Sequence, residues 1–523
     1  MLDQGLGSWP RRRARISPHR TALVYEGRAW SYAQVHERVT RLAHVLRGLG
    51  VGPGDRIGYL GRNHPALAET LFAAGAVGAV LVPLNFRLTA PELAFMLRDS
   101  GARVLVWGPE LAGTVAELRD TACVDRYVEV GTDLESLLAG APTDPLDEPV
   151  TLDQPCMIQY TSGTSGRPKG VVLTHGNITW NAYNILIDVD LASDEVALLV
   201  APLFHTGALN QILLPTFLKG GASVLMPAFD ADRVLELIAE HRVTFTFCVP
   251  AMFQAIAQSP RWPAADLSSM RTLMCAGAPV PEPLIRTYQQ RGLTFLQGYG
   301  LTETAPGALL LRAGESTSKV GSTGTPCFFT DVRVVRPDQT DVAVGETGEV
   351  IIRGPNVMRG YWHRPEETEA AFYPGDWFRS GDGAQVDADG YVYIADRIKD
   401  MIISGGENIY PAEVESVLFG HPAVADCAVI GVPDRKWGEV GRAVVVLRAG
   451  AAATAEEIVA HLAGKLAGYK IPRSVVFAEA LPRTGSGKVL KRRLRESYGS
   501  STGPAGPPST GEPAPAKGAS TWT

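Results

Sequence analysis

Between residues 56 and 300 the sequence alternates short β-branched runs with helical patterns, and this alternation limits the fold more than any other feature. Runs in which apolar residues follow one another are typical of parallel strands buried on both faces. Helical segments between such strands predict crossover helices and an α/β sheet covered on both sides. We expect strands at residues 56–60, 79–83, 103–107, 195–200, 222–226, 244–249, 270–275 and 294–297.

Beyond residue 321 the pattern changes twice. Short strands separated by Gly, Pro and Asp-Gly turns predict an antiparallel sheet or small β-barrel at 321–396. The segment 397–498 indicates an α+β unit, and roughly 100 residues are enough for a small domain. Gly, Pro, Ser, Thr and Ala dominate 499–523, which predicts a disordered tail. We therefore expect a large domain at 1–396, a small domain at 397–498, and that tail.

Composition and charge exclude several classes of function. A chain of 523 residues is too long for a single hydrophobic core, so at least two domains are expected. The net charge is −6, and the sequence has no basic stripe interleaved with aromatic residues. Nucleic acid is therefore not an expected partner. The longest apolar stretch, 71–84, is shorter than the roughly 20 residues that span a bilayer, which predicts no stable membrane insertion. The oligomeric state stays open, a homodimer included.

The cysteines and the N-terminal arginines carry weaker indications. Six cysteines lie far apart, with no CxxC pair and no histidine at metal-ligand spacing, which predicts reduced core thiols in a cytoplasmic protein. No apolar signal region follows the arginine cluster at 11–15, so we expect a solvated arm there.

The strongest chemical signal is the segment YTSGTSGRPK at residues 160–169, directly after a predicted strand. Small residues allow close approach of the backbone, hydroxyl groups donate to phosphate oxygens, and a lysine supplies a cation. The GxxxxGK[ST] spacing is missing, which disfavours ordinary P-loop NTPases. The alternative is a flexible Ser/Gly linker. The predicted phosphate contacts are Thr161, Ser162, Gly163, Thr164, Ser165, Gly166 and Lys169.

Further segments follow in a fixed order. They are QGYGLTET at 297–304, RSGD at 379–382, YVYIADRIK at 391–399, IISGGENIYP at 402–411 and PRTGSGK at 482–488. Together with the phosphate loop they resemble the motifs of the adenylate-forming superfamily, which includes acyl-CoA synthetases, luciferases and peptide-synthetase adenylation domains. The resemblance implies a large N-terminal domain of two parallel-type α/β sheets plus a small β-barrel, and a small mobile C-terminal α+β domain.

The resemblance also implies which residues bind ATP. Tyr299 offers an aromatic face to adenine, and Asp382 can accept hydrogen bonds from the ribose hydroxyls. Taken alone, these would be a core tyrosine and an Asx turn. The further residues implied for the nucleotide are Gly277, Ala278, Pro279, Gln297, Gly298, Gly300, Thr302, Arg397 and Lys488.

Four residues are implied in the chemistry. Glu303 resembles the family's Mg²⁺ ligand, with Thr161 beside it, because a hard cation between phosphates needs oxygen donors. Lys488 resembles the lysine that bridges the acid's carboxylate and the α-phosphate, a task that suits a point charge on a flexible stem. His205 matches the position that gates the acyl pocket in relatives. A surface glutamate, a surface lysine and a core histidine are the ordinary alternatives.

Three remaining assignments come from the same resemblance. Lys399 matches the hinge about which the small domain rotates between half-reactions. The acyl pocket is implied at His205, Leu209, Phe253, Ala276, Gly298 and Gly300. The passage for coenzyme A is implied at Ser404, Gly405, Gly406, Glu407 and Trp437.

The implied activity is an ATP-dependent, AMP-forming ligation of a fatty or aryl carboxylic acid to CoA, through an acyl adenylate and with Mg²⁺ as cofactor. Small-molecule acid, ATP and CoA are the expected partners. The same adenylation could serve a carrier-protein pantetheine, or could activate nitrite in a natural-product pathway. A nucleotide-binding pseudoenzyme is disfavoured, because Lys169, Glu303, Asp382, Arg397 and Lys488 are all present.

Overall fold

The computed structural model of the chain describes residues 3–146, 148–162, 168–397, 400–404, 407–484 and 487–499. Apart from Gly499, the predicted tail lies outside these ranges. Within them, none of the helices combines the length and apolar character that crossing a membrane requires.

The first α/β sheet has seven strands in the order β18-β8-β7-β4-β3-β5-β6. Helices α4 (Ala90–Ser100) and α5 (Ala112–Thr121) pack on one face, while α2 (Tyr32–Gly48), α3 (Pro65–Ala76) and α6 (Thr132–Ala139) pack on the other. The strands are β3 (Arg56–Leu60), β4 (Val80–Leu84), β5 (Ala102–Trp107), β6 (Arg126–Glu129), β7 (Pro155–Ser162), β8 (Pro168–Thr174) and β18 (Gly360–Tyr361).

The second sheet has nine strands in the order β15-β14-β13-β12-β11-β9-β10-β1-β2. Its strands are β1 (Thr21–Tyr25), β2 (Arg28–Ser31), β9 (Val196–Leu199), β10 (Ala222–Leu225), β11 (Phe245–Cys248), β12 (Thr272–Cys275), β13 (Phe295–Gly300), β14 (Gly307–Leu310) and β15 (Thr325–Pro326). Its helices are α7 (His175–Asp188), α8 (Thr206–Ala208), α9 (Leu214–Lys219), α10 (Ala231–His241), α11 (Pro250–Gln258) and α12 (Glu282–Gln289).

The largest apolar core lies between the two sheets. Helix α3 is buried over almost its whole length, and its Phe72 ring lies 4.7 Å from the Phe217 ring of α9. On the far side of the second sheet, α10, α11 and α12 cover a separate core around Phe253, Tyr288 and Phe295. Every predicted strand of this region is present, because strands buried on both faces have continuous apolar runs.

A third, antiparallel sheet follows, with the order β16-β17-β20-β19 and β21 paired to β20. One of the Asp-Gly turns, Asp389-Gly390, joins β20 to β21, and Gly390 has the positive φ of +84° that such a turn needs. Its elements are β16 (Asp331–Val335), β17 (Gly348–Arg353), α13 (Pro365–Ala370), β19 (Phe372–Tyr373), β20 (Trp377–Val386) and β21 (Val392–Arg397).

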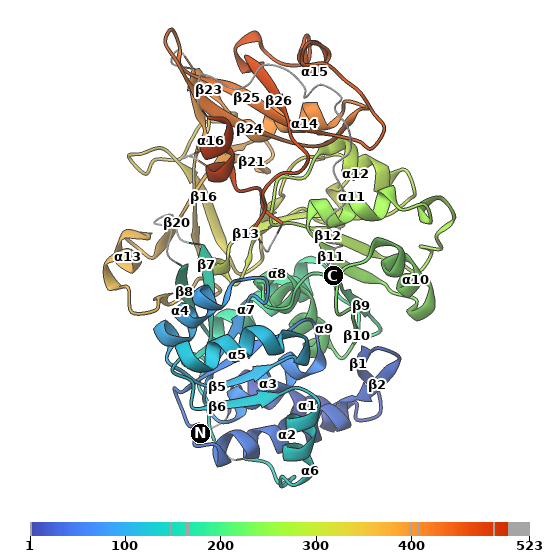
Figure 1. The fold of residues 1–523 in the computed structure, drawn as a ribbon, viewed down its shortest axis with the longest axis vertical. Helices are drawn as coiled ribbons and strands as arrows, with labels where there is room; N and C mark the ends of the chain where they lie inside the picture. The colour runs from blue at the N-terminus through green and yellow to red at the C-terminus, as the bar shows by residue number, and fades with distance from the viewer. Residues whose placement is uncertain are drawn as a thin grey trace.

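A small α+β unit ends the described chain, and Figure 1 shows it in orange and red above β11, β12 and β13. Helices α14 (Pro411–Phe419) and α15 (Ala455–Leu462) cover one face of its sheet, and α16 (Lys491–Tyr498) covers the other. The strands are β22 (Ile402–Ser404), β23 (Glu407–Ile409), β24 (Val424–Asp434), β25 (Gly438–Leu447) and β26 (Ser474–Phe477). The predicted fold class, a large α/β domain with a curled sheet and a small C-terminal domain, is confirmed.

The prediction of a solvated N-terminal arm is wrong. Residues Trp9–Ile16 form helix α1, which buries Trp9 in the main core. Two arginines of the cluster bind main-chain carbonyls: Arg12 donates to Asp3 at 2.6 Å and Arg13 donates to Leu218. The arginines therefore fasten the N-terminus to the two-sheet body. One cysteine also departs from expectation, because Cys123 is exposed while the other five are buried.

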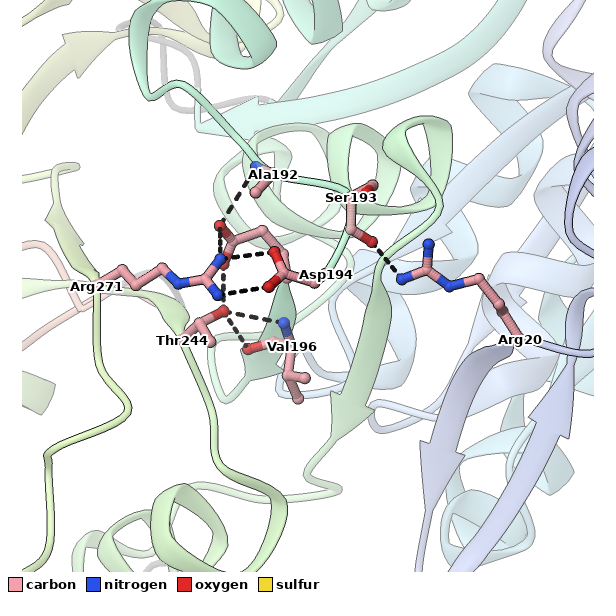
Figure 2. Close-up of polar contacts among 8 residues, drawn as sticks. Arg20, Ala192, Ser193, Asp194, Val196, Thr244 and Arg271 are labelled. Atoms are coloured by element: carbon pink, nitrogen blue, oxygen red, sulfur yellow. Dashed lines mark hydrogen bonds and ion pairs between the residues drawn. The ribbon is translucent and has the colours of Figure 1, made fainter.

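An ion-pair network ties strands of the second sheet together (Figure 2). Arg271, just before β12, makes two hydrogen bonds to Asp194 at 2.8 and 2.7 Å and one to Glu195 at 3.1 Å. Glu195 also accepts from Thr244, whose hydroxyl oxygen accepts from Val196 N at 2.9 Å. The hydrogen bonds to Arg271 lower the pKa of Asp194 to about 2. This network joins the amino ends of β9, β11 and β12, opposite the ends at which the predicted site lies.

Candidate functional site

The predicted site residues gather where parallel strands of the second sheet end. Strands β9, β11, β12 and β13 are parallel neighbours, so their carboxyl ends lie at one edge of the sheet. The segments that follow them contain His205, Val249, the loop 276–279 and the stretch Gly300 to Glu303. Ligands of open α/β sheets collect at such an edge.

The predicted phosphate loop is the connection of a hairpin. Strands β7 and β8 are antiparallel within an otherwise largely parallel sheet, and they bracket residues 163–167, which lie outside the described chain. Thr161 and Lys169 are direct partners across the hairpin. The hairpin therefore places a hydroxyl and an ammonium opposite each other at the base of the loop.

Tyr361 links the phosphate-loop lysine to the predicted metal ligand. The Lys169 ammonium lies 5.0 Å from the centre of the Tyr361 ring, a cation–π distance. The Tyr361 hydroxyl donates to Glu303 Oε1 at 3.0 Å. Glu303 is also fixed through its backbone, because its carbonyl accepts from Met358 N at 2.7 Å. One tyrosine thus aligns the cation and the carboxylate.

No motif of the sequence pointed to Tyr361. It lies on β18, a two-residue strand that comes from the region predicted as barrel but pairs with β8 of the first sheet. The next residues anchor it: Trp362 Nε1 donates to the Asp99 carbonyl at 3.0 Å, and Arg364 pairs with the Asp99 carboxylate at 2.9 Å. The sequence signal there is a Gly-Tyr-Trp segment ahead of a Pro-capped helix. This segment is too short to be recognised as a strand.

The same aspartate holds the strand that leads into the loop. Tyr160 Oη donates to Asp99 Oδ2 at 2.7 Å. Burial is the main cause of a raised pKa of Tyr160, and this hydrogen bond raises it further. The phenol therefore keeps its proton and acts as the donor. Asp99 therefore binds both the phosphate hairpin and the segment that carries Tyr361.

Tyr299 and Asp382, both predicted at the nucleotide, are hydrogen-bonded to each other. Tyr299, near the end of β13, donates to Asp382 Oδ2 at 2.7 Å. Asp382 is buried on β20, and its neighbour across the hairpin is Arg397 on β21. Gly277 begins the loop after β12 with a φ of +90°, a conformation that favours glycine and turns Ala278 and Pro279 along the same edge. Gln297 is buried on β13, before Gly298.

The small C-terminal unit brings Lys488 to this edge. A Cβ at Gly487 would lie 3.3 Å from Val249 Cγ2, so the loop touches the chain just beyond β11. The loop is closed by hydrogen bonds from Thr484 N to the Lys488 carbonyl at 2.7 Å and from Lys488 N to Thr484 Oγ1 at 3.1 Å. A second contact between the two parts joins Gln254 Nε2 to the Ala425 carbonyl at 2.6 Å.

The predicted acyl-pocket residues fall into two groups. His205 lies ahead of α8, with its ring 4.3 Å from that of Phe204, and Ala276, Gly298 and Gly300 lie along the strand ends. Leu209 is fully buried in the main core, and Phe253 packs between Tyr288 and Phe295. The first group is therefore at the edge of the sheet, and the second lies in the cores behind it.

The residues predicted for CoA lie on the small unit. Ser404 on β22 pairs with Gly438, which places Trp437 at the neighbouring hairpin turn, where it is 38 % exposed. Lys436 Nζ lies 4.6 Å from the Trp437 ring. Glu407 begins β23 and is exposed. Gly405, Gly406 and the predicted hinge Lys399 lie outside the described residues.

The donor set suits a cation that is shared with phosphates. In the described part of the chain, no three His, Cys, Asp or Glu side chains cluster as a metal cage would. Mg²⁺ is usually held by one or two carboxylates together with substrate phosphates. Glu303, which Tyr361 links to Lys169, and Thr161, which lies opposite Lys169 on the hairpin, are the predicted oxygen donors for such a cation.

Comparisons with known proteins agree with this geometry. Residues 10–362 match the family model of the AMP-binding enzymes, and residues 413–488 match the model of their C-terminal domain. A feruloyl-CoA synthase of an Amycolatopsis species is 56% identical over 499 residues, covering 95% of this chain and 100% of the relative. A long-chain-fatty-acid–CoA ligase of Mycobacterium tuberculosis is 40% identical over 500 residues, covering 95% and 99%.

A solved structure shows the same architecture. An anthranilate CoA ligase in complex with anthranoyl-AMP superposes with a TM-score of 0.90 at 29% identity, covering 95% of this chain and 97% of that one. The family models, the full-length relatives and this fold lead to one conclusion. The chain belongs to the AMP-binding enzymes, in the acyl-CoA synthetase branch of the adenylate-forming superfamily, and it is an AMP-forming acid–CoA ligase.

Proposed function

We propose that the acid is aromatic and of the ferulic acid kind. The observation that carries this proposal is the 56% identity to a feruloyl-CoA synthase along that relative's entire length, against 40% to the long-chain fatty acid ligase. The residues expected around the acyl group are small or apolar, apart from His205. None of them is an arginine or lysine that could pair with a second carboxylate, which argues against dicarboxylic acids.

In the proposed first half-reaction, a carboxylate oxygen of the acid attacks the α-phosphorus of ATP, and pyrophosphate leaves. Catalysis is mostly positioning and charge stabilisation. Lys488 would sit between carboxylate and α-phosphate, and Lys169 with the phosphate loop would hold the β- and γ-phosphates. When bound by Glu303 and Thr161, Mg²⁺ would neutralise charge on the phosphates. Tyr361 would keep Lys169 and Glu303 in register, which its two contacts support.

The nucleoside would lie between Tyr299 and the loop Gly277–Pro279, with its ribose on Asp382 and Arg397. The Tyr299 to Asp382 hydrogen bond supports this assignment, because it fixes the carboxylate next to the aromatic face. Gln297, Gly298, Gly300 and Thr302 would complete the wall.

In the proposed second half-reaction, the CoA thiol attacks the acyl carbon and AMP leaves. Lys488 would block that approach, so we propose that residues 397–498 rotate about Lys399 relative to residues 1–396. The rotation would replace the Lys488 loop by Ser404, Gly405, Gly406, Glu407 and Trp437. Such a rotation would break contacts between the two parts, including the hydrogen bond from Gln254 to the Ala425 carbonyl.

A panel of acids tests the proposal. Purified protein is incubated with ATP, Mg²⁺ and ferulic, cinnamic, indoleacetic, octanoic or malonic acid, with and without CoA, and pyrophosphate release is followed. We expect the highest kcat/KM with ferulic acid and sustained turnover only with CoA. Preference for octanoic acid would refute the aromatic class. Multiple turnovers without CoA, or turnover only with a carrier-protein pantetheine, would favour another acceptor. Activity only with nitrite in place of the carboxylic acids would favour the alternative acid.

We further propose that the enzyme works in the cytoplasm, where ATP and CoA are available. Its six cysteines are all free thiols, as a reducing compartment would keep them. A homodimer also stays a proposal, which sedimentation of the purified protein would decide.

A further inference from the structure

The segment that follows His205 contains a buried amide with an unmatched acceptor. Residues Leu209–Leu213 form a π-helix between α8 and α9, a rare geometry that is frequent at functional sites. Gln211 lies in its middle, and its Oε1 has no hydrogen-bond partner among the described residues. A buried acceptor without a donor is destabilising, so a group that supplies the donor is expected.

Residual accessibility distinguishes Gln211 from its neighbours. It is 5 % exposed, whereas Leu209, Asn210, Ile212 and Leu213 are between 0 and 1 % exposed. Asn210 also has an unmatched amide, but with 0 % exposure it is closed off from any ligand. Within this π-helix, Gln211 therefore keeps the most exposed surface, although Oε1 itself is covered, so a ligand reaches this oxygen only when the terminal amide turns towards it.

The amide of Gln211 lies beside the wall of the predicted site. A Cβ on Gly307 would come within 3.2 Å of Gln211 Nε2, so the terminal amide packs against the backbone of β14. Gly307 is the direct partner of Gly300 at the end of β13. Gly300 in turn is one of the residues expected to border the acyl group. The missing side chain of Gly307 thus leaves room for the amide beside this wall.

The unmatched atom selects one kind of ligand group. A carbonyl oxygen accepts a hydrogen bond, so its partner must carry an O–H or N–H. An alkyl chain has neither, whereas a phenol offers an O–H at the far end of a rigid ring. We propose that Gln211 Oε1 accepts a hydrogen bond from the ring hydroxyl of an aromatic acid and thereby selects hydroxylated rings. This inference rests on the proposed aromatic acid, and it adds the residue that reads the ring.

Three acids and two variants test the assignment. The value of kcat/KM for pyrophosphate release is measured with 4-hydroxycinnamic, 4-methoxycinnamic and cinnamic acid, in the presence of CoA. The wild type should favour the hydroxylated acid over the other two by about tenfold or more, because the analogues leave the buried acceptor unmatched. The methoxy group of 4-methoxycinnamic acid keeps the ring oxygen but lacks the O–H that donates the hydrogen bond.

Gln211→Leu should bring the ratio between 4-hydroxycinnamic and cinnamic acid close to one. Thr216→Val is the matched control. Thr216 lies in α9 just beyond the π-helix, and its hydroxyl is also buried and without a partner in the described chain, but its methyl group faces Gly221 rather than β14. Thr216→Val should keep the wild-type ratio.

Two results would overturn the assignment. One is a Gln211→Leu enzyme that slows on both acids alike and keeps the wild-type ratio. The other is a wild-type enzyme that shows no preference among the three acids. This measurement uses the wild type alone, so it does not depend on whether a variant folds. Absence of turnover with all three acids would overturn the aromatic proposal as well, so the two failures are distinguishable.

Discussion

Replacing Tyr361 separates its two contacts, because Tyr361→Phe removes the hydroxyl and leaves the ring. The lost hydrogen bond to Glu303 has a charged acceptor, for which a net contribution of about 1.5–3 kcal/mol is typical. Glu303 is partly exposed, so the lower end applies, which corresponds to about a tenfold change. We expect kcat/KM for ATP to fall by that factor, with a higher Mg²⁺ concentration needed for half-maximal rate.

Tyr361→Leu removes the ring as well. The cation–π contact with Lys169 is worth about 0.5–1 kcal/mol at an accessible site, a further two- to fivefold loss. Pyrophosphate release at saturating acid, measured against ATP and Mg²⁺ for both variants, gives the two increments separately.

Tyr393→Phe provides the control. Its hydroxyl donates to Asp387 at 3.3 Å on the third sheet, so it removes a tyrosine–carboxylate bond of the same kind away from the phosphates. It should leave the Mg²⁺ dependence unchanged. A Tyr361→Phe enzyme with wild-type ATP and Mg²⁺ dependence, or an equal loss in Tyr393→Phe, would refute this role of Tyr361.

Three other expectations concern single residues. Lys488→Ala should abolish adenylation from acid and ATP yet largely retain thioester formation from supplied acyl adenylate; equal loss of both, in separate half-reaction assays, contradicts its role. Tyr299→Phe removes the hydrogen bond from Tyr299 Oη to Asp382, so KM for ATP should rise by about tenfold with little change for the acid. Burial lowers the pKa of His175 to about 4 from 6.5, so the unfolded chain binds more protons between these values. The free energy of unfolding should therefore fall by up to about 3 kcal/mol as the pH drops from 6.5 towards 4. Urea unfolding at pH 7 and pH 5 should show a smaller pH effect on this free energy in His175→Gln than in the wild type.

Much of the fold was predictable because its strands are buried on both faces. The run at 56–60 coincides with β3 to the residue. Hydrophobic periodicity does not predict an element that is short, or one whose structure depends on tertiary contacts. The arginines of α1 suggested a solvated arm, yet Arg12 and Arg13 bind carbonyls that are distant in sequence or lie across a turn.

The site was predictable in part. The motifs singled out Lys169, Glu303, Tyr299 and Asp382, and the structure brings them into two groups. Tyr361 contacts both Lys169 and Glu303, and Tyr299 is hydrogen-bonded to Asp382. Tyr361 was missed because its role depends on a two-residue strand that pairs with a distant hairpin. Gln211 could not be found from sequence either, since an unmatched acceptor is a property of packing.

The central claim is that a carboxylate oxygen attacks the α-phosphorus of ATP. Ferulic acid labelled with ¹⁸O in both carboxylate positions tests it most directly, when converted with ATP, Mg²⁺ and CoA and the products are analysed by mass spectrometry. The account predicts one ¹⁸O atom in AMP and one in the thioester, with none in pyrophosphate. Label in inorganic phosphate together with ADP, or AMP free of ¹⁸O, would contradict it.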